Sequence, residues 1–137
     1  MRITREVDYA FRIVGNLSRS GAQVVPASQI SDEEEIPLRF TLRILRKLNL
    51  AGITEAKRGA TGGYKLCKDP KDVSLYDVVT AIDGPIVINR CLDGQSPYCT
   101  KNKCVDAMGH CKFHVKLSNL QSTIIKDLKD SKLNEFI

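Results

Sequence analysis

Four of the five cysteines lie between residues 91 and 111, and this cluster is the part of the sequence best equipped for chemistry. The spacing is Cys91-x7-Cys99-x4-Cys104-x6-Cys111, and His114 follows three residues after the last thiol. Thiolates and imidazole select zinc, copper(I) or iron–sulfur clusters over oxygen-loving cations. Structural zinc sites usually contain tight Cys-x2-Cys pairs, so these wider gaps favour an iron–sulfur cluster. Zinc and redox-active thiols are the alternatives.

The remaining reactive side chains favour simpler interpretations. Cys67 stands apart at the end of a predicted strand, so we expect a small core residue. We expect His110 to be an exposed loop residue that could substitute as a ligand. No activated nucleophile or acid–base pair is visible, so the sequence predicts neither an enzyme nor a small-molecule substrate.

The compartment in which the protein is located determines whether its cysteines can form disulfides. No apolar stretch approaches the roughly 18 to 20 residues that span a bilayer, and the first residues contain no signal-peptide block. We therefore expect a cytoplasmic protein without a membrane partner. In that reducing compartment five cysteines are not expected to form disulfides, and an odd number would leave one over.

The positive charge of the chain is concentrated in one segment. The formal net charge is +5, and residues 37–68 contain eight lysines and arginines but a single acidic residue, Glu55. Charge of this kind is expected where a segment contacts phosphate. The segment is therefore a candidate nucleic-acid interface.

Three helices are predicted at the start of the chain. The first spans Thr4 to Arg19 with Thr4 as N-cap, the second begins at Pro26, and the third runs from about Pro37 to Leu50. In the third helix, one stripe is predicted to be buried and consists of Leu38, Leu42, Leu45 and Leu48. The neighbouring sector is cationic and consists of Arg39, Arg43, Arg46 and Lys47. A helix-turn-helix presents such a polar sector to the major groove.

A β-hairpin and two more helices are predicted to follow. Residues 52–67 contain two β-prone runs around a glycine-rich loop, whose tip carries Lys57 and Arg58. Such a wing can reach the minor groove, and its glycines are expected to serve loop conformation. Ser74 is expected to cap a helix at about 75–82. A long helix from Cys111 to about residue 130 carries an apolar stripe that needs a partner, most economically a second copy of the chain.

Several of these segments together resemble a known family. In order they are MRITREVDYAFRI, IPLRFTLRILRKLNLAGI, the wing KRGATGGYKL, VSLYDVVTAIDGPI and the later cysteines. This set is similar to the IscR, NsrR, RirA and CymR regulators, often called the Rrf-two family, over nearly the whole chain. The resemblance implies a mainly α-helical fold with a small β-hairpin wing: a winged helix-turn-helix plus a long C-terminal dimerisation helix. It also implies a homodimer that binds double-stranded promoter DNA.

The resemblance also implies a ligand set for a cluster. Cys91 and Cys111 match the first and last cluster cysteines of the cluster-binding members, and either Cys99 or Cys104 supplies the middle one. For the fourth ligand, His114 matches the IscR-like members and Asp8 the NsrR-like members, in which the aspartate comes from the partner subunit. A histidine three residues after Cys111 can reach the same metal, which favours His114. A 2Fe-2S cluster is favoured over 4Fe-4S.

These expectations combine into one functional prediction. The chain is divided into a DNA-binding domain (1–70), a connecting helix with the cysteine loop (71–110), and a dimerisation helix with tail (111–137). DNA contacts are expected from six residues: Arg39, Thr41, Arg43, Lys57, Arg58 and Gly59. An iron–sulfur cluster would control promoter affinity. The alternatives are a zinc-bound or thiol-switched repressor of sulfur metabolism, and a regulator that acts through a protein partner.

Overall fold

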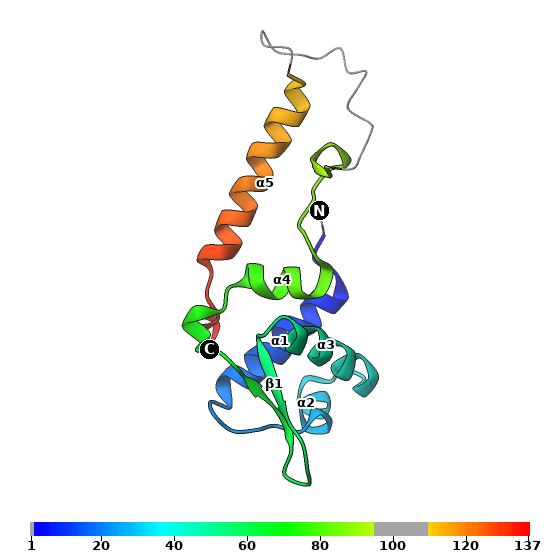
Figure 1. Cartoon of the computed structure of the whole chain (residues 1–137), viewed down its shortest axis with the longest axis vertical. Helices are drawn as coiled ribbons and strands as arrows, with labels where there is room; N and C mark the ends of the chain where they lie inside the picture. Colours follow the sequence, from blue (N-terminus) through cyan, green and yellow to red (C-terminus); the bar gives the residue numbers. More distant parts are fainter. Residues whose placement is uncertain (1, 95–109) are drawn as a thin grey trace.

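The computed structural model describes residues 2–94 and 110–137, so Cys99 and Cys104 lie outside the described residues. The elements in order are α1 (Arg5–Arg19), α2 (Ala27–Glu34), α3 (Leu38–Leu50), β1 (Thr54–Lys57), β2 (Gly63–Leu66), α4 (Leu75–Asp83) and α5 (Lys112–Asp130). Short 3-10 helices occur at Pro70–Asp72, Arg90–Leu92 and Leu133–Phe136. The prediction of a mainly helical chain with one hairpin is confirmed (Figure 1).

Helix α1 is the centre of the core. The Thr4 hydroxyl accepts a hydrogen bond from the backbone N–H of Val7, which confirms the predicted N-cap. Apolar residues at helical spacing then form a stripe that is completely buried against α2, α3 and α4: Val7, Ala10, Ile13, Val14 and Leu17. Burial of this stripe, rather than local propensity, provides most of the stability of such a helix.

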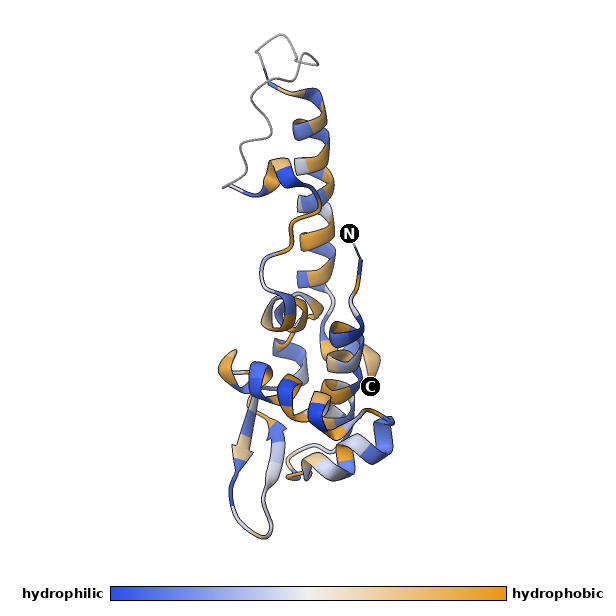
Figure 2. Ribbon diagram, turned by 90° about the vertical axis from the view of Figure 1, so that its right-hand side faces the viewer, coloured by the Kyte–Doolittle hydropathy of each residue, from blue (hydrophilic) through white to orange (hydrophobic). Residues whose placement is uncertain are grey.

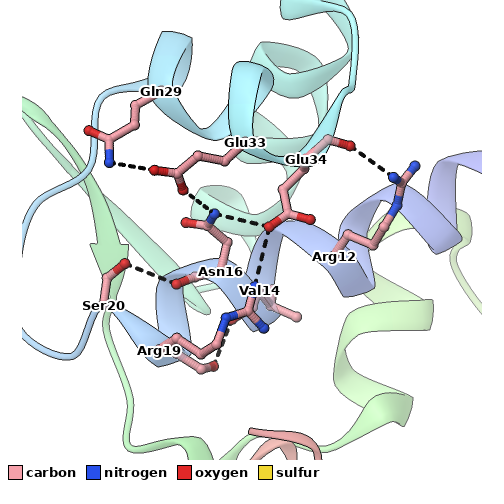
Figure 3. A network of polar contacts seen from close by, with 9 residues as sticks. Arg12, Val14, Asn16, Arg19, Ser20, Gln29, Glu33 and Glu34 are labelled. Atoms are coloured by element: carbon pink, nitrogen blue, oxygen red, sulfur yellow. Dashed lines mark hydrogen bonds and ion pairs between the residues drawn. The ribbon is translucent and has the colours of Figure 1, made fainter.

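A polar network fixes α2 across α1 (Figure 3). The Asn16 side-chain amide donates to Glu33 Oε2 at 2.7 Å and to Glu34 Oε1 at 3.0 Å. Arg12 donates to the backbone carbonyl of Glu34 at 2.8 Å, and Arg19 pairs with the Glu34 carboxylate at 3.3 Å. These contacts hold the end of α2, just before the turn into α3. They therefore help to set the angle between the two helices of the helix-turn-helix.

The buried face of α3 differs from the predicted leucine stripe. Leu45 and Leu48 are buried as expected, together with Ile44 and Thr41, but Leu38 and Leu42 are 45% and 44% exposed. Both sets satisfy helical spacing, so spacing alone does not choose between them. The structure buries the stripe that contains the β-branched Ile44 and Thr41, which rotates Leu38 and Leu42 toward solvent.

The hairpin of β1 and β2 extends beyond the helices (Figure 1). Its antiparallel register pairs Thr54 with Leu66 and Lys57 with Gly63. A bridge between Val25 and Tyr64 joins β2 to the segment before α2, with hydrogen bonds of 2.9 and 2.8 Å in the two directions. The hairpin is therefore anchored through Tyr64 of β2, and the loop between the two strands projects beyond this anchor.

Helix α4 and the tail complete the core. Ser74 and Asp77 form a capping box at the start of α4, which confirms the predicted cap. Leu133 in the tail is 3% exposed, and its backbone N–H donates to the carbonyl of Val73. The 3-10 helix Leu133–Phe136 thus packs against α1 and the 3-10 helix Pro70–Asp72.

Helix α5 projects away from this core (Figure 1). No residue of α5, all of which the structure describes, is fully buried. Apolar residues recur along its length (Figure 2), and Leu120 is 43% exposed. Among the described residues no helix is long and apolar enough to cross a membrane.

Candidate functional site

Two arginines of the recognition-type helix α3 are arranged around an aromatic ring. The guanidinium carbons of Arg39 and Arg43 lie 4.9 and 5.0 Å from the centroid of Phe40. Phe40 itself contacts Tyr9 of α1, with centroids 6.2 Å apart. Cation–π contacts of this kind orient exposed guanidinium groups without neutralising their charge. The structure therefore brings together Arg39 and Arg43 as one cationic surface.

Glu6 connects this surface to α1 and α4. Its Oε1 atom lies 3.2 Å from Arg43 Nε and 3.1 Å from Lys47 Nζ. Lys47 Nζ also donates to the backbone carbonyl of Ile82, near the end of α4, at 3.1 Å. One carboxylate thus holds two cations of α3, and one of these cations holds the end of α4.

The prediction that Thr41 contacts DNA is wrong. It is 0% exposed, and its hydroxyl donates to the carbonyl of Pro37 at 3.3 Å. The side chain therefore belongs to the core and does not reach the surface shared by Arg39 and Arg43.

The wing tip presents charge on a backbone shaped by glycine. Lys57, Arg58 and Gly59 are exposed. Gly59 has φ 111°, a conformation that favours glycine. A Cβ atom on Gly62 would lie 2.2 Å from the carbonyl oxygen of Lys57, which no side chain could tolerate. The expectation that these glycines serve loop conformation is confirmed.

A second candidate site lies between the segment after α4 and the start of α5. A cavity of about 550 Å³ is lined there by Cys91, His110, Cys111 and His114, together with Val115, Ser118 and Asn119. The side-chain amide of Asn89 donates to Cys91 Sγ at 3.2 Å. Cys111 is the N-cap of α5, and its sulfur accepts from the His114 backbone N–H at 3.5 Å. Both sulfurs thus accept N–H donors, which suits thiolates.

The chemistry of this cavity fits a thiophilic metal group. His114 Nδ1 is buried and has no hydrogen-bond partner among the described residues. A buried ring nitrogen without a partner costs free energy unless something coordinates it. Within residues 2–94 and 110–137 no three potential ligands converge closely enough to hold an ion. A complete ligand set therefore requires a donor from outside those ranges or from a partner subunit.

Asp8 is not part of this cavity. It lies in the first turn of α1, is exposed, and is 3.7 Å from Arg12 Nε in an i,i+4 ion pair. The structure does not bring Asp8 and Cys91 together within one chain.

Cys67 is not the core residue that we expected. It is exposed, directly after β2, and its thiol lies 3.6 Å from Glu55 Oε2. Partial burial and the neighbouring Glu55 carboxylate raise the pKa of this thiol. Tyr64 and Leu66 of β2 pack against the core, so alternation along the strand places the next residue, Cys67, on the opposite side.

Sequence reasoning missed Glu6 and Asn89. Glu6 reads as an ordinary acidic residue of a first helical turn, and its pairing with α3 depends on how the helices cross. Asn89 lies two residues before Cys91, and this short spacing is the feature of the sequence that indicates a contact between the two side chains.

Comparisons with known proteins agree with this architecture. The Rrf2 family model, described as an iron-dependent transcriptional regulator, matches residues 3–137. A putative HTH-type transcriptional regulator, rrf2-like, of Rhodobacter capsulatus is 36% identical over 108 residues, covering 76% of this chain and 71% of that protein. The HTH-type transcriptional regulator IscR of Vibrio atlanticus is 27% identical, covering 100% of this chain and 75% of that protein.

Two solved structures share the fold. CymR, the global cysteine regulator of B. subtilis, has a TM-score of 0.77 at 19% identity, covering 99% of this chain and 95% of that one. IscR of T. potens has a TM-score of 0.75 at 16% identity, covering 99% and 85%. The relatives are named as regulators of transcription, not as enzymes. With a winged helix-turn-helix in place and the family model matching nearly every residue, the chain belongs to the Rrf2 family of DNA-binding transcriptional regulators.

Proposed function

We propose that this regulator is a homodimer whose affinity for promoter DNA is controlled by an iron–sulfur cluster. The observation that carries the proposal is the buried, partnerless Nδ1 of His114 in a cavity that also contains Cys91 and Cys111. The description of the matching family model, an iron-dependent transcriptional regulator, and the likeness to IscR are consistent with it.

The proposed ligands are Cys91, Cys111 and His114, with Cys99 or Cys104 as the third thiolate. Asp8 of a partner subunit is the alternative to His114. These residues would hold a 2Fe-2S cluster, which we favour over 4Fe-4S, and the cluster would supply a redox-active group. Cys91 follows α4 and Cys111 begins α5, so joint ligation by the two residues fixes the start of α5 relative to the end of α4.

The proposed dimer interface is α5. Its apolar residues are left half exposed in the single chain, and a second α5 is the economical way to bury them. Leu120→Glu is therefore expected to convert the dimer to a monomer in analytical ultracentrifugation. A variant that sediments as the wild type does would contradict this interface.

The proposed DNA interface combines α3 with the wing. Arg39 and Arg43 contact bases or phosphates in the major groove, and the wing tip of Lys57, Arg58 and Gly59 reaches the minor groove. Arg58→Ala is expected to weaken binding of duplex DNA and to reduce its dependence on salt by about one charge. An unchanged salt dependence would place the wing away from DNA.

Anaerobic reconstitution tests the cluster. The full chain, incubated with iron and sulfide, is expected to gain visible absorption and labile sulfide; a colourless protein would refute the proposal. Cys111→Ser is expected to lose the cluster. Cys67→Ser is the matched control, since Cys67 lies outside the cavity, and it is expected to retain the cluster. Separate His114→Ala and Asp8→Ala variants distinguish the two candidates for the fourth ligand.

The likeness to CymR supports a second candidate function. CymR is described as a global cysteine regulator, and another solved relative is an oxidised form of Staphylococcus aureus CymR. A thiol-switched or zinc-bound repressor of sulfur metabolism would use the same cysteines without iron. Metal analysis of freshly purified protein separates the two, because zinc near one per chain without labile sulfide favours this alternative. A failure to bind any DNA would instead favour action through a protein partner.

A further inference from the structure

Two leucines lie exposed on α3, on the sector of the helix next to the arginines. Leu38 and Leu42 are 45% and 44% exposed, and they are one helical turn apart. Large apolar side chains at such positions are hydrated in the single chain. A surface that binds DNA is usually polar, so this leucine pair requires a specific explanation.

The arginines leave the leucine pair uncovered. Arg39 and Arg43 both place their guanidinium carbons within about 5 Å of the Phe40 ring. Arg43 is also drawn toward Glu6 of α1, at 3.2 Å. Both guanidinium groups are thus held toward the Phe40 ring, and Leu38 and Leu42 remain exposed on the neighbouring sector of the helix.

The position of the pair on the helix fits base contact. In a helix-turn-helix the first turns of the second helix approach the base edges, while later turns leave the groove. Leu38 begins α3 and Leu42 follows one turn later. Leu50, at the last position of the same helix, is 79% exposed and serves as a comparison residue outside that region.

We propose that Leu38 and Leu42 determine specificity by selecting thymine in each DNA half-site. The thymine 5-methyl group is the apolar group that a base pair presents in the major groove. A leucine pressed against any other base edge removes water from a donor or acceptor and replaces no hydrogen bond, which is costly. Leucine contact therefore favours thymine and disfavours the other three bases. The inference rests on the proposed DNA interface and adds the base that it reads.

Replacing thymine by uracil tests the contact, since uracil lacks the methyl group and keeps the same base pairing. The full chain, purified without oxygen, is first used to select bound duplexes from a random DNA pool. In the tightest duplex each thymine is then replaced singly by deoxyuridine. At one or two positions per half-site we expect affinity to fall about three- to tenfold.

Leucine variants assign the effect to residues. Leu42→Ala and Leu38→Ala are expected to bind the thymine duplex more weakly and to discriminate thymine from uracil less than twofold at the affected position. Leu50→Ala is expected to retain the full discrimination. Both replaced leucines are exposed, so thermal unfolding midpoints are expected to match the wild type and to exclude misfolding as the cause.

The outcomes separate this inference from the proposed function. If the protein selects and binds DNA but no uracil substitution changes affinity, or if both alanine variants discriminate like the wild type, the thymine contact is wrong while DNA binding stands. A leucine pair that serves a protein partner would give that result. If the protein binds no duplex at any salt concentration, the DNA interface itself falls and the inference falls with it.

Discussion

Two glycines, Gly63 at the loop end of β2 and Gly15 within α1, are expected to respond oppositely to the same substitution by alanine. A Cβ on Gly63 would lie 2.4 Å from the carbonyl oxygen of Val25 and 2.7 Å from the nitrogen of Pro26. This is roughly 1 Å closer than ordinary van der Waals contact. A Cβ on Gly15 would meet only the end of the Arg19 side chain, at 3.4 Å.

The expected changes in the free energy of unfolding follow from the contacts that each substitution breaks. Relieving the clash at Gly63 separates Val25 from Tyr64 and breaks two hydrogen bonds of 2.9 and 2.8 Å. Each contributes about 1 kcal/mol, so with residual strain Gly63→Ala is expected to lower the free energy of unfolding by about 2 to 4 kcal/mol. Gly15→Ala reduces the backbone freedom of the unfolded chain and is expected to raise the free energy of unfolding by about 0.5 to 1 kcal/mol.

Thermal unfolding followed by circular dichroism measures both effects, at one fixed protein concentration because association shifts the midpoint. At roughly 3 to 4 °C per kcal/mol for a chain of this size, Gly15→Ala raises the midpoint by about 2 to 4 °C and Gly63→Ala lowers it by about 6 to 16 °C. A Gly63→Ala protein that unfolds at the wild-type temperature would show that the contact with Val25 does not constrain the wing.

Three further predictions concern charge. Glu6→Gln removes the carboxylate that pairs with two cations of α3, so affinity for duplex DNA at low salt is expected to rise about two- to fivefold in fluorescence anisotropy. Burial raises the pKa of the Cys67 thiol, so its alkylation between pH 7 and 9, followed by mass spectrometry, is expected to be slower than that of a short cysteine peptide. The hydrogen bond from Asn16 lowers the pKa of Glu33 in the folded protein. The ionised Glu33 side chain therefore stabilises the fold fully above its unfolded pKa, and this contribution is lost as pH falls through the folded pKa. Glu33→Gln is expected to flatten that part of the acid unfolding curve.

The helices could be predicted from the sequence because their signals are local. Thr4 and Ser74 are N-caps whose side chains act within three residues, and both predictions are confirmed. The glycine-rich wing was equally clear, since Gly59 and Gly62 occupy backbone positions that exclude other residues. Caps, turns and helical period depend on neighbours in the chain, so the sequence contains them.

The errors concern positions that only tertiary packing decides. Leu38 was expected to be buried and is exposed, whereas Thr41 was expected to contact DNA and is buried. The reason is that α3 offers two apolar stripes, and its packing against α1 selects one of them. Cys67 is exposed because Tyr64 and Leu66 supply the core-facing side of β2, and Cys67 follows on the other side. Of the predicted metal ligands, Cys91, Cys111 and His114 share a cavity. The choice between Cys99 and Cys104 depends on residues outside the described ranges.

The arrangement of α4 explains how the cysteine segment and the DNA-binding surface can influence each other. The end of α4 is held from one side by Lys47 of α3, which donates to Ile82, and by Thr4, whose hydroxyl donates to Asp83 at 3.0 Å. From the other side, the Ile88 N–H donates to Gln121 of α5 at 3.0 Å. The segment 84–88 thus connects a hydrogen bond to α5 with the end of α4, where Lys47 of α3 is bound. Since Lys47 shares the Glu6 carboxylate with Arg43, three consecutive polar contacts connect the end of α4 to an arginine of the proposed DNA surface.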